Sequence, residues 1–484
     1  MNRRIMNIVN FVRGYDPEGK DIFYPLKRQV EVNKQYGIKN TFLLQYDAML
    51  RDDFNQLFLT ERNENMELGV WFENCRQLIE RVGLEWKGRW DWDWHVNVGF
   101  LPGYELPYRE KIIDEVFRLF KEIYGEYPQV VGSWLMDSYS MNYMCEKYNI
   151  KAFCICREQY AVDAYTLWGG YSNGGYYPCK NNMLCPAQTE EAQMNAPVFR
   201  MLGPDPIYNY DGEKYYRGEK RYVWTMEPAW HCGREPETMD WYFDTYYKTP
   251  CLAFAESTTG QENPFGWNVF GEGYIMQIEK LVKLQEEGVL VLEKLGDTGE
   301  AFKKAYKVTP PQAQVALTDW NGNGIKTVWY NSKNYKANIF LKDGQLFFRD
   351  INKYDEKYVE RYIDKRCESW LATYDALPII DSRLWSSEKE ECGLFIKGEV
   401  ANIEVVEESE TDLRIDIFYQ NGGKGKILFT ENGIQCRNMC LDFVFGSPED
   451  TEISIKGDKI MGKHNGFEYE MKLIKEKDVT IISI

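Results

Sequence analysis

Short apolar segments alternate with segments of helical periodicity along the first part of this chain, and this alternation limits its fold more than any other feature. The helical segments include residues 25–36 and 108–124, and the second carries apolar residues at a spacing of three and four. Alternating strands and helices favour a parallel sheet covered by helices. About seven or eight strands predict a (β/α)7–8 barrel. The expected strands are residues 5–12, 40–45, 67–72, 130–134, 151–156, 197–202, 221–226 and 251–255.

The pattern of apolar and polar residues changes after Thr309, where two prolines follow one another. Beyond this point helical periodicity largely stops, and short alternating apolar segments are separated by turns such as NGNG and NGGKG. This pattern is typical of an all-β domain and predicts a sandwich-like arrangement. We therefore expect a β/α-barrel domain at residues 1–308 and a C-terminal β-rich domain at residues 309–484.

Acidic residues follow many of the expected strands. The stretch VVGSWLMDSY at 130–139 begins as a buried strand, continues into Trp134, and reaches Asp137 just before a segment with helical character. In a barrel the carboxyl ends of the strands face a common mouth, so acids at these ends converge there. An Asp at this position also serves as the N-cap of the following helix, so a structural role stays open. The other strand-end acids are Asp16, Asp47, Glu73, Glu158, Glu227 and Glu262.

Two carboxyl groups at one mouth are what hydrolysis of a glycosidic bond requires. One of them protonates the leaving oxygen, and a tryptophan-lined site keeps its pKa high by desolvation. We expect Asp137 and Glu262 to form this catalytic pair, with Glu227 as the third candidate. Glu227 lies in TMEPAW, and Glu262 lies in GQENPFGW between two amide side chains suited to sugar hydroxyls. Each of the three acids could instead be a solvated loop residue or a helix cap.

Aromatic residues make up 15% of the chain, with 34 Tyr and 15 Trp, and many stand beside Gly, Asn or Asp. Flat amphipathic rings beside polar groups suit the faces of sugars, although they also fill ordinary cores. Residues 161–193 are rich in Gly, Tyr and Asn and predict a long loop of the kind that forms lids or binding sites. The residues expected to contact the substrate are Arg13, Trp71, Glu73, Trp94, His95, Trp134, Gln159 and Trp168.

Charge and composition exclude several classes of partner. The net charge of −17 argues against binding to nucleic acid or to an anionic membrane surface. No apolar run approaches the length of about 18 residues that a membrane span needs, and the N-terminus does not resemble a secretory signal. The 12 cysteines are therefore expected to be free thiols in a reducing cytoplasm.

Other catalytic chemistries find little support. The three histidines, His95, His231 and His464, form no HxH or HxxxH pair, and no paired CxxC motif is present. We expect no bound metal and no cofactor, with a metal site built from His95, His231 and Asp137 as the weaker alternative. No GxSxG motif indicates a serine nucleophile, and no glycine-rich loop has the spacing of a phosphate site.

The order of these motifs resembles the glycoside hydrolase and polysaccharide deacetylase β/α-barrel superfamily over residues 1–308. YGIKNTFLL is similar to the "GIPATFF" pattern of the deacetylases, and ENMELGVWFENC is similar to their "HEIGNHTxxH". The stretch YPQVVGSWLMDSYSMNYMCEKYNIKAFCI is similar to the segment of the fourth strand. The two histidines that hold the deacetylase metal correspond here to Trp71 and Cys75, which argues against a metal-dependent deacetylase.

The resemblance also implies roles for the acids. Glycosidases of families 57 and 38 place a catalytic carboxylate after the fourth strand, where this chain has Asp137. Their acid lies on a later strand, which here corresponds to Glu227 or Glu262. The first-strand HxD motif that binds zinc in family 38 is missing. A β-rich domain after the barrel is similar to that of these glycosidases.

The sequence therefore predicts a glycoside hydrolase that acts on an oligosaccharide or glycoside through a pair of carboxylates. A carbohydrate-binding protein on a degenerate deacetylase-like barrel is the second hypothesis, and a metal-dependent carbohydrate hydrolase is the third. A carbohydrate is the expected partner, and assembly into a homo-oligomer stays open.

Overall fold

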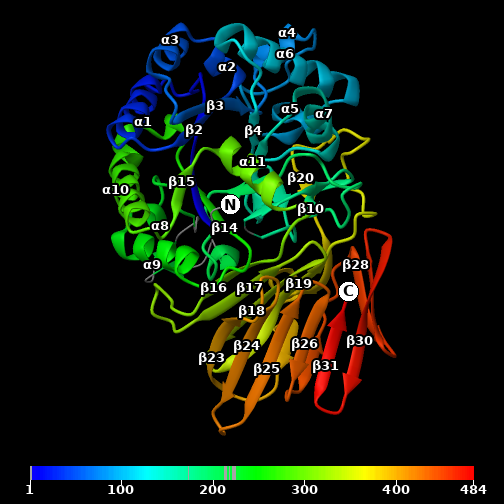
Figure 1. Cartoon of the computed structure of the whole chain (residues 1–484). Helices are drawn as coiled ribbons and strands as arrows, with labels where there is room; N and C mark the ends of the chain where they lie inside the picture. The colour runs from blue at the N-terminus through cyan, green and yellow to red at the C-terminus, as the bar shows by residue number, and fades with distance from the viewer. Residues whose placement is uncertain (1–2, 173, 212–214, 217–218, 221–224) are drawn as a thin grey trace.

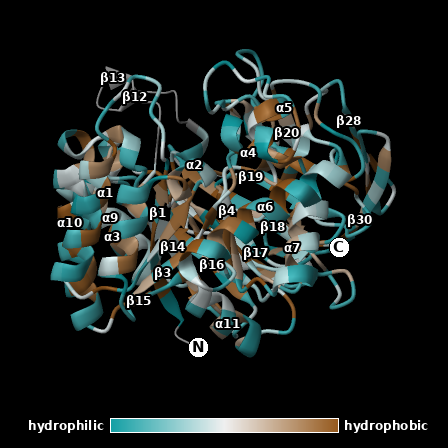
Figure 2. Cartoon of the chain, turned by 90° about the horizontal axis from the view of Figure 1, so that it is seen from above, coloured by the Kyte–Doolittle hydropathy of each residue, from teal (hydrophilic) through white to brown (hydrophobic). Residues whose placement is uncertain are grey.

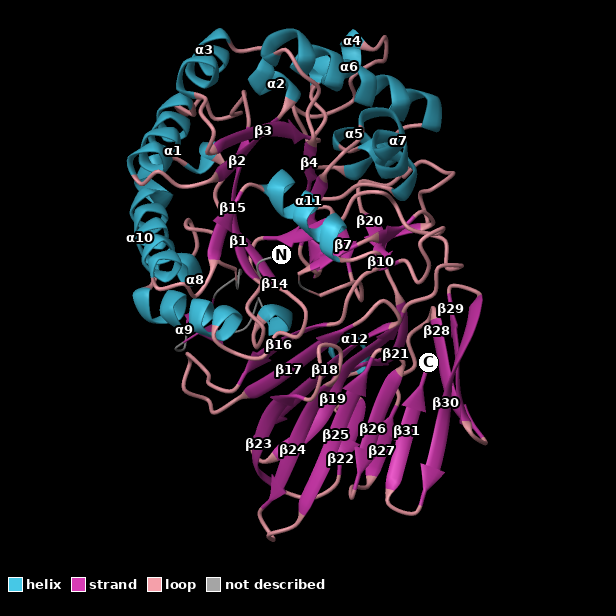
Figure 3. Ribbon diagram, in the orientation of Figure 1, coloured by secondary structure: helices cyan, strands magenta, loops and turns pink. Residues whose placement is uncertain are grey.

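The computed structural model describes residues 3–172, 174–211, 215–216, 219–220 and 225–484. Its first part is a parallel sheet surrounded by helices, and its second part consists of antiparallel sheets (Figures 1 and 3). The parallel strands run in the order β14-β1-β2-β3-β4-β5-β11, with β15 also paired to β1. Their bounds are β1 (Arg4–Val12), β2 (Asn40–Leu44), β3 (Met66–Trp71), β4 (Val130–Ser133), β5 (Ala152–Cys156), β11 (Val198–Met201), β14 (Ala255–Thr259) and β15 (Val291–Glu293).

The two ends of this sheet approach one another at β11 and β14. The backbone N–H of Leu202, just after β11, donates a hydrogen bond of 3.0 Å to Oγ1 of Thr258 on β14. Within the described residues β11 and β14 share no ladder of backbone hydrogen bonds. The mixed α/β architecture with a parallel sheet is thus as the sequence predicted.

The helices cover the outside of the sheet, and Figure 2 shows apolar strands at the centre of the molecule. α6 illustrates why these segments are helical, because its apolar residues recur on one buried face, including Ile112, Val116 and Phe120. α6 ends at Gly125, whose φ of 84° is the left-handed conformation that glycine adopts at low cost. The main helices are α1 (Phe23–Gln35), α3 (Asp52–Glu61), α6 (Leu106–Tyr124), α7 (Ser138–Tyr148), α9 (Pro236–Tyr247), α10 (Trp267–Glu286) and α11 (Leu295–Ala305).

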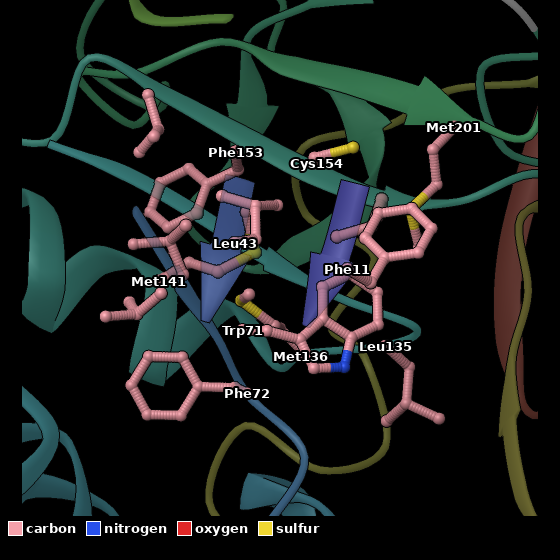
Figure 4. Packing of buried hydrophobic residues seen from close by; sticks show 14 of the residues in the cluster. Phe11, Leu43, Trp71, Phe72, Leu135, Met136, Met141, Phe153, Cys154 and Met201 are labelled. Atoms are coloured by element: carbon pink, nitrogen blue, oxygen red, sulfur yellow. The ribbon is translucent and has the colours of Figure 1, made fainter. Parts of the chain in front are cut away.

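The core inside the sheet is built around Trp71 (Figure 4). Its indole lies 4.4 Å from the ring of Phe11 and 5.1 Å from that of Trp134, measured between centroids. Gly132 of β4 makes room for it, since a Cβ there would lie 2.8 Å from Cε3 of Trp71 and 2.4 Å from Cδ1 of Leu43. Any larger residue at position 132 would displace Trp71 from this core.

Two antiparallel sheets form the C-terminal part, in agreement with the predicted β-rich texture. They share one hydrophobic cluster, to which β24 contributes Leu413, Ile415 and Ile417 on alternate positions. The first sheet contains β16 (Gln312–Ala316), β17 (Lys326–Asn331), β18 (Tyr335–Lys342), β19 (Gln345–Lys353), β21 (Leu377–Asp381), β22 (Gly393–Ile396) and β27 (Leu441–Val444). The second contains β23 (Val400–Glu407), β24 (Leu413–Tyr419), β25 (Lys424–Thr430), β26 (Gly433–Arg437), β28 (Thr451–Lys456), β29 (Lys459–His464), β30 (Phe467–Glu476) and β31 (Val479–Ser483).

A segment of the C-terminal part returns to the parallel sheet. Tyr354, Cys367 and Tyr374 are buried in the same hydrophobic cluster as Trp71. Within this segment β20 (Ala372–Tyr374) pairs in parallel with β7 (Tyr165–Leu167). The predicted boundary at residue 308 stays a prediction, and residues from beyond it help to build the first part of the molecule.

Two sequence predictions of local structure were wrong, and both segments are shaped by distant partners. Residues 161–193 are not one loop, since they contain β7 and the short strands β8 (Gly175–Tyr176), β9 (Pro178–Cys179) and β10 (Asn182–Pro186). The strand expected at 251–255 lies instead at β14, whose polar sequence AESTT pairs in parallel with β1. Residues 221–224 of the strand expected at 221–226 lie outside the described residues.

Across the described ranges, no helix is both long and apolar enough to cross a membrane. The 12 cysteines all fall within the described residues and are free, as predicted, with Cys440 the exposed one.

Glu256 on β14 gives a prediction about stability. Its side chain is fully buried, neither carboxyl oxygen has a hydrogen-bond partner among the described residues, and burial raises its pKa well above the ordinary value. The unfolded chain releases this proton at lower pH than the folded chain, so Glu256 destabilises the fold as pH rises. Glu256→Gln is expected to raise the urea midpoint clearly at about pH 9 and little at about pH 5. An equal shift at both pH values would contradict this account.

Candidate active site

Arg13, the residue after β1, joins acids from two other strand ends. Its Nε and Nη2 donate to Glu73 after β3, at 3.1 Å to Oε2 and 3.0 Å to Oε1. Its Nη1 lies 3.2 Å from Oε2 of Glu262, beyond β14. Glu73 also accepts a hydrogen bond of 3.0 Å from the indole N–H of Trp71. The predicted residues Trp71, Glu73, Arg13 and Glu262 are therefore linked in that order by direct contacts at one end of the sheet.

The position of Glu262 follows from the turn after β14. Gly260 has a φ of 138°, and a Cβ there would lie 1.8 Å from the carbonyl oxygen of Val9, so only glycine allows this close approach. The turn is then tied to β1, because Asn263 Nδ2 donates to the carbonyl of Arg13 at 3.0 Å. These contacts hold the Glu262 carboxyl beside Arg13.

Burial raises the pKa of Glu262 to about 8. The positive charge of Arg13 lowers this pKa, while the nearby charges of Glu73 and Glu227 raise it further. Desolvation is the largest effect, because the carboxyl is only 5% exposed. Glu262 is therefore mostly protonated at neutral pH, which is the state that a general acid requires.

Glu227 is the neighbouring carboxyl, and its pKa is also raised by burial, to about 7. Thr225 Oγ1 donates to its Oε2 at 3.2 Å, and Gln261 Nε2 donates to its Oε1 at 3.3 Å. Gln261 directly precedes Glu262 in the chain, so one turn positions both glutamates. Burial therefore raises the pKa values of both carboxyls towards neutrality, where a carboxyl can serve as an acid or as a base.

Asp47 is a further acid of this site. It is one of the strand-end acids, but it is not among the predicted catalytic or substrate-binding residues. It follows β2 and accepts a hydrogen bond of 2.9 Å from the backbone N–H of Gly14 at Oδ1. Its Oδ2 is buried without a hydrogen-bond partner among the described residues, and burial raises its pKa to about 6. Its place at a strand end was the signal available in the sequence.

Asp137 lies in different surroundings. It caps α7, accepting hydrogen bonds of 2.8 Å from both the backbone N–H and the hydroxyl of Ser140. Arg109 on α6 forms a fully buried ion pair with it at 2.8 Å. The carboxyl whose pKa is raised by the Asp137 charge is Glu360, whereas Glu262 responds to Glu73 and Glu227. These contacts match the helix-cap alternative raised by the sequence.

Of the other tryptophans predicted to line the site, Trp134 and Trp94 contact rings of the first part of the molecule, and Trp168 contacts the C-terminal part. Trp134 is half-buried against Phe11 and Trp71, and Trp94 lies among other rings of its loop. Trp168 instead faces the C-terminal part, where its indole N–H donates to Asp381 at 2.7 Å. Gln159 begins the strand β6 (Gln159–Val162).

The three residues of the alternative metal site, His95, His231 and Asp137, each contact different neighbours. His95 lies against the ring of Trp370, with centroids 5.2 Å apart, whereas His231 Nδ1 lies 2.8 Å from Glu235. Asp137 is paired with Arg109, as above. In the part of the chain that the structure describes, no group of three or more His, Cys, Asp or Glu side chains is arranged to hold a metal ion.

Glu158, the acid after β5, connects the site region to the C-terminal sheet. Lys336 on β18 lies 2.9 Å from Glu158 and 2.9 Å from Asp350, and all three side chains are buried. Tyr210 also donates to Glu158 at 2.8 Å. Glu158 therefore links the parallel sheet to the C-terminal sheet through a buried network with Lys336 and Tyr210.

Comparison with known proteins finds a solved structure of similar fold. No family model matches the sequence, and no curated protein matches it. A solved structure from Parabacteroides distasonis, assigned provisionally as a glycoside hydrolase/deacetylase, is 12% identical with a TM-score of 0.56, covering 77% of this chain and 91% of that one. A provisional polysaccharide deacetylase from Mycobacterium smegmatis is 11% identical with a TM-score of 0.39, covering 64% and 93%.

A GH57 branching enzyme from Thermococcus kodakaraensis is 9% identical with a TM-score of 0.27, covering 63% of this chain and 72% of that one. The Parabacteroides distasonis structure shares its fold with most of this chain.

Proposed function

We propose that the chain is a glycoside hydrolase in which Glu262 is the general acid and Glu227 is the base or nucleophile. The observation that carries this proposal is the pair of buried glutamates with pKa values of about 8 and about 7, positioned by one turn beside Arg13. The proposal replaces the expected pairing of Glu262 with Asp137, whose oxygens are occupied by Arg109 and the start of α7.

The chemistry requires each acid in a different protonation state. Glu262 gives its proton to the glycosidic oxygen as the bond from that oxygen to the anomeric carbon breaks, and the oxygen keeps the bonding electron pair. Ionised Glu227 either takes a proton from a water that attacks the anomeric carbon, or attacks that carbon itself. In the second case a water that gives its proton to Glu262 then attacks the anomeric carbon, the bond to Glu227 breaks, and the sugar is released. Asp47 has a buried oxygen without a partner among the described residues, and it would accept a hydrogen bond from a sugar hydroxyl.

We also propose that the parallel sheet closes into a barrel whose mouth carries these acids. The hydrogen bond between Leu202 and Thr258 supports closure between β11 and β14. Acids that follow β2, β3 and β14 lie at the same ends of parallel strands, which is where barrels of this kind place their reacting groups.

The test is a panel of α- and β-linked aryl glycosides, assayed with the wild-type chain and with Glu227→Ala. We expect turnover of one glycoside class, and a loss of about 10²–10⁴-fold in kcat for the variant. Azide, a small anionic nucleophile, should restore part of the variant's activity and leave the wild type unchanged. Undiminished turnover by Glu227→Ala, or wild-type binding of glycans without any turnover, would overturn the proposal.

A further inference from the structure

A series of aromatic rings leads away from the group around Arg13. The guanidinium carbon of Arg13 lies 4.3 Å from the ring centroid of Trp92. The Trp92 and Trp94 centroids are 5.8 Å apart, and Trp94 stacks on Trp90 at 5.2 Å with an interplanar angle of 30°. Trp92 is buried, whereas 37% of Trp90 is exposed. The rings therefore run from the candidate acids to the surface.

A second branch of this series reaches Trp370. The ring of His95 lies 6.2 Å from Trp94 and 5.2 Å from Trp370, measured between centroids. The backbone N–H of Val96 donates to the carbonyl of Trp370 at 3.0 Å, which fixes the two loops together.

Trp370 is the most exposed ring of the series, with 48% of its surface accessible. It belongs to the segment that returns from the C-terminal part, so this surface is incomplete without that segment. Its neighbour Leu371 is 40% exposed as well. Large apolar side chains left open beside a site of polar groups mark a place where a ligand lies.

The orientation of the outer rings is fixed by charged groups. Arg89 lies over both Trp90 and Trp94, with its guanidinium carbon 4.6 Å and 4.1 Å from their centroids. Asp93 holds this arginine through a hydrogen bond of 2.9 Å from Nε, and it also accepts one of 3.1 Å from the backbone N–H of His95. A surface that is already ordered loses little conformational entropy when a ligand binds.

We propose that Trp90 and Trp370 are outer sugar-binding positions, and that the substrate is an extended glycan chain. This inference rests on the proposed function, because the rings lead to the same acids. Indole faces stack on the apolar faces of sugar rings, and the half-exposed Arg89 carries N–H donors for hydroxyl groups beside them. Consecutive centroids from Trp90 through Trp94 and His95 to Trp370 stand 5.2–6.2 Å apart, and the proposal assigns different sugars of one chain to the two exposed ends of this series.

The test compares Trp90→Ala and Trp370→Ala with the wild type on aryl glycosides that carry one to six sugars. We expect the wild-type kcat/KM to rise with chain length, and each variant to lose about two- to tenfold on the long substrates alone. Tyr127→Ala is the matched control, because Tyr127 is 41% exposed but precedes β4 at the opposite end of the strands from the acids. A wild-type kcat/KM independent of length, or equal losses on the shortest substrate, would overturn the inference.

A binding measurement separates this inference from the proposed function. Affinity electrophoresis in gels that contain a soluble α-glucan, β-glucan or glycol chitin reports binding without turnover. Retardation that depends on Trp370, from a chain with no hydrolytic activity, would support the glycan surface and overturn the hydrolase proposal. Turnover of short glycosides without retardation or length dependence would support the hydrolase and overturn the extended substrate.

Discussion

Glu262→Gln is expected to lower kcat/KM by about 10²–10⁴-fold, because the amide cannot donate the proton that the leaving oxygen needs. The fold should survive, since Gln has the shape of the protonated acid that burial favours here. Glu360→Gln is the matched control. Glu360 is also a buried glutamate whose pKa is raised to about 8, but it accepts hydrogen bonds from the backbone N–H groups of Ser138 and Met183 beside α7. Its substitution should leave kcat/KM nearly unchanged.

The pH profile of the wild type should be bell-shaped. Glu227 must be ionised, so activity is lost as pH falls through its pKa of about 7. Glu262 must be protonated, so activity is lost as pH rises through its pKa of about 8. The two apparent pKa values belong to the pair, because each charge affects the other. Residual activity of Glu262→Gln should lack the alkaline limb, and a profile that keeps it would exclude Glu262 as the acid.

Arg109→Met is expected to reduce the free energy of unfolding by about 3–5 kcal/mol, because it leaves Asp137 charged, buried and unpaired. Arg109 and Asp137 are both fully buried, and Arg109 also donates to the carbonyl oxygens of Tyr104 and Tyr362, each at 2.7 Å. Urea unfolding measures the loss. Arg118→Met is the exposed control, where the lost ion pairs on the surface of α6 should cost about 0–1 kcal/mol.

The partner substitution decides whether Asp137 takes part in the reaction. Asp137→Asn should destabilise the fold but leave the kcat of the folded protein within about twofold of the wild type. In the double variant with Arg109→Met, part of the lost stability should return, because neither charge is left alone in the core. A large fall in kcat of Asp137→Asn with unchanged stability would show that Asp137 is a catalytic residue.

Much of the secondary structure could be predicted from local pattern. The buried face of α6 follows a helical periodicity, and the strands around Phe42 and Val131 are short, fully buried runs. Both signals depend only on neighbouring residues. β14 was misplaced because its sequence is polar, with Glu256 at its second position, and its strand conformation depends on pairing with β1. Pairing partners some 250 residues away leave no periodic signal.

The candidate site shows the same division between local pattern and fold. Local pattern was enough to place acids and tryptophans after strands, including Glu262 and Trp134. Only the folded chain places Arg13 between Glu73 and Glu262. Folding also pairs Asp137 with Arg109 and brings the ring of Trp370 against that of His95. The reason is physical: a side-chain pattern reports which face of an element is buried, whereas charge pairing and pKa depend on which distant groups share the same desolvated space.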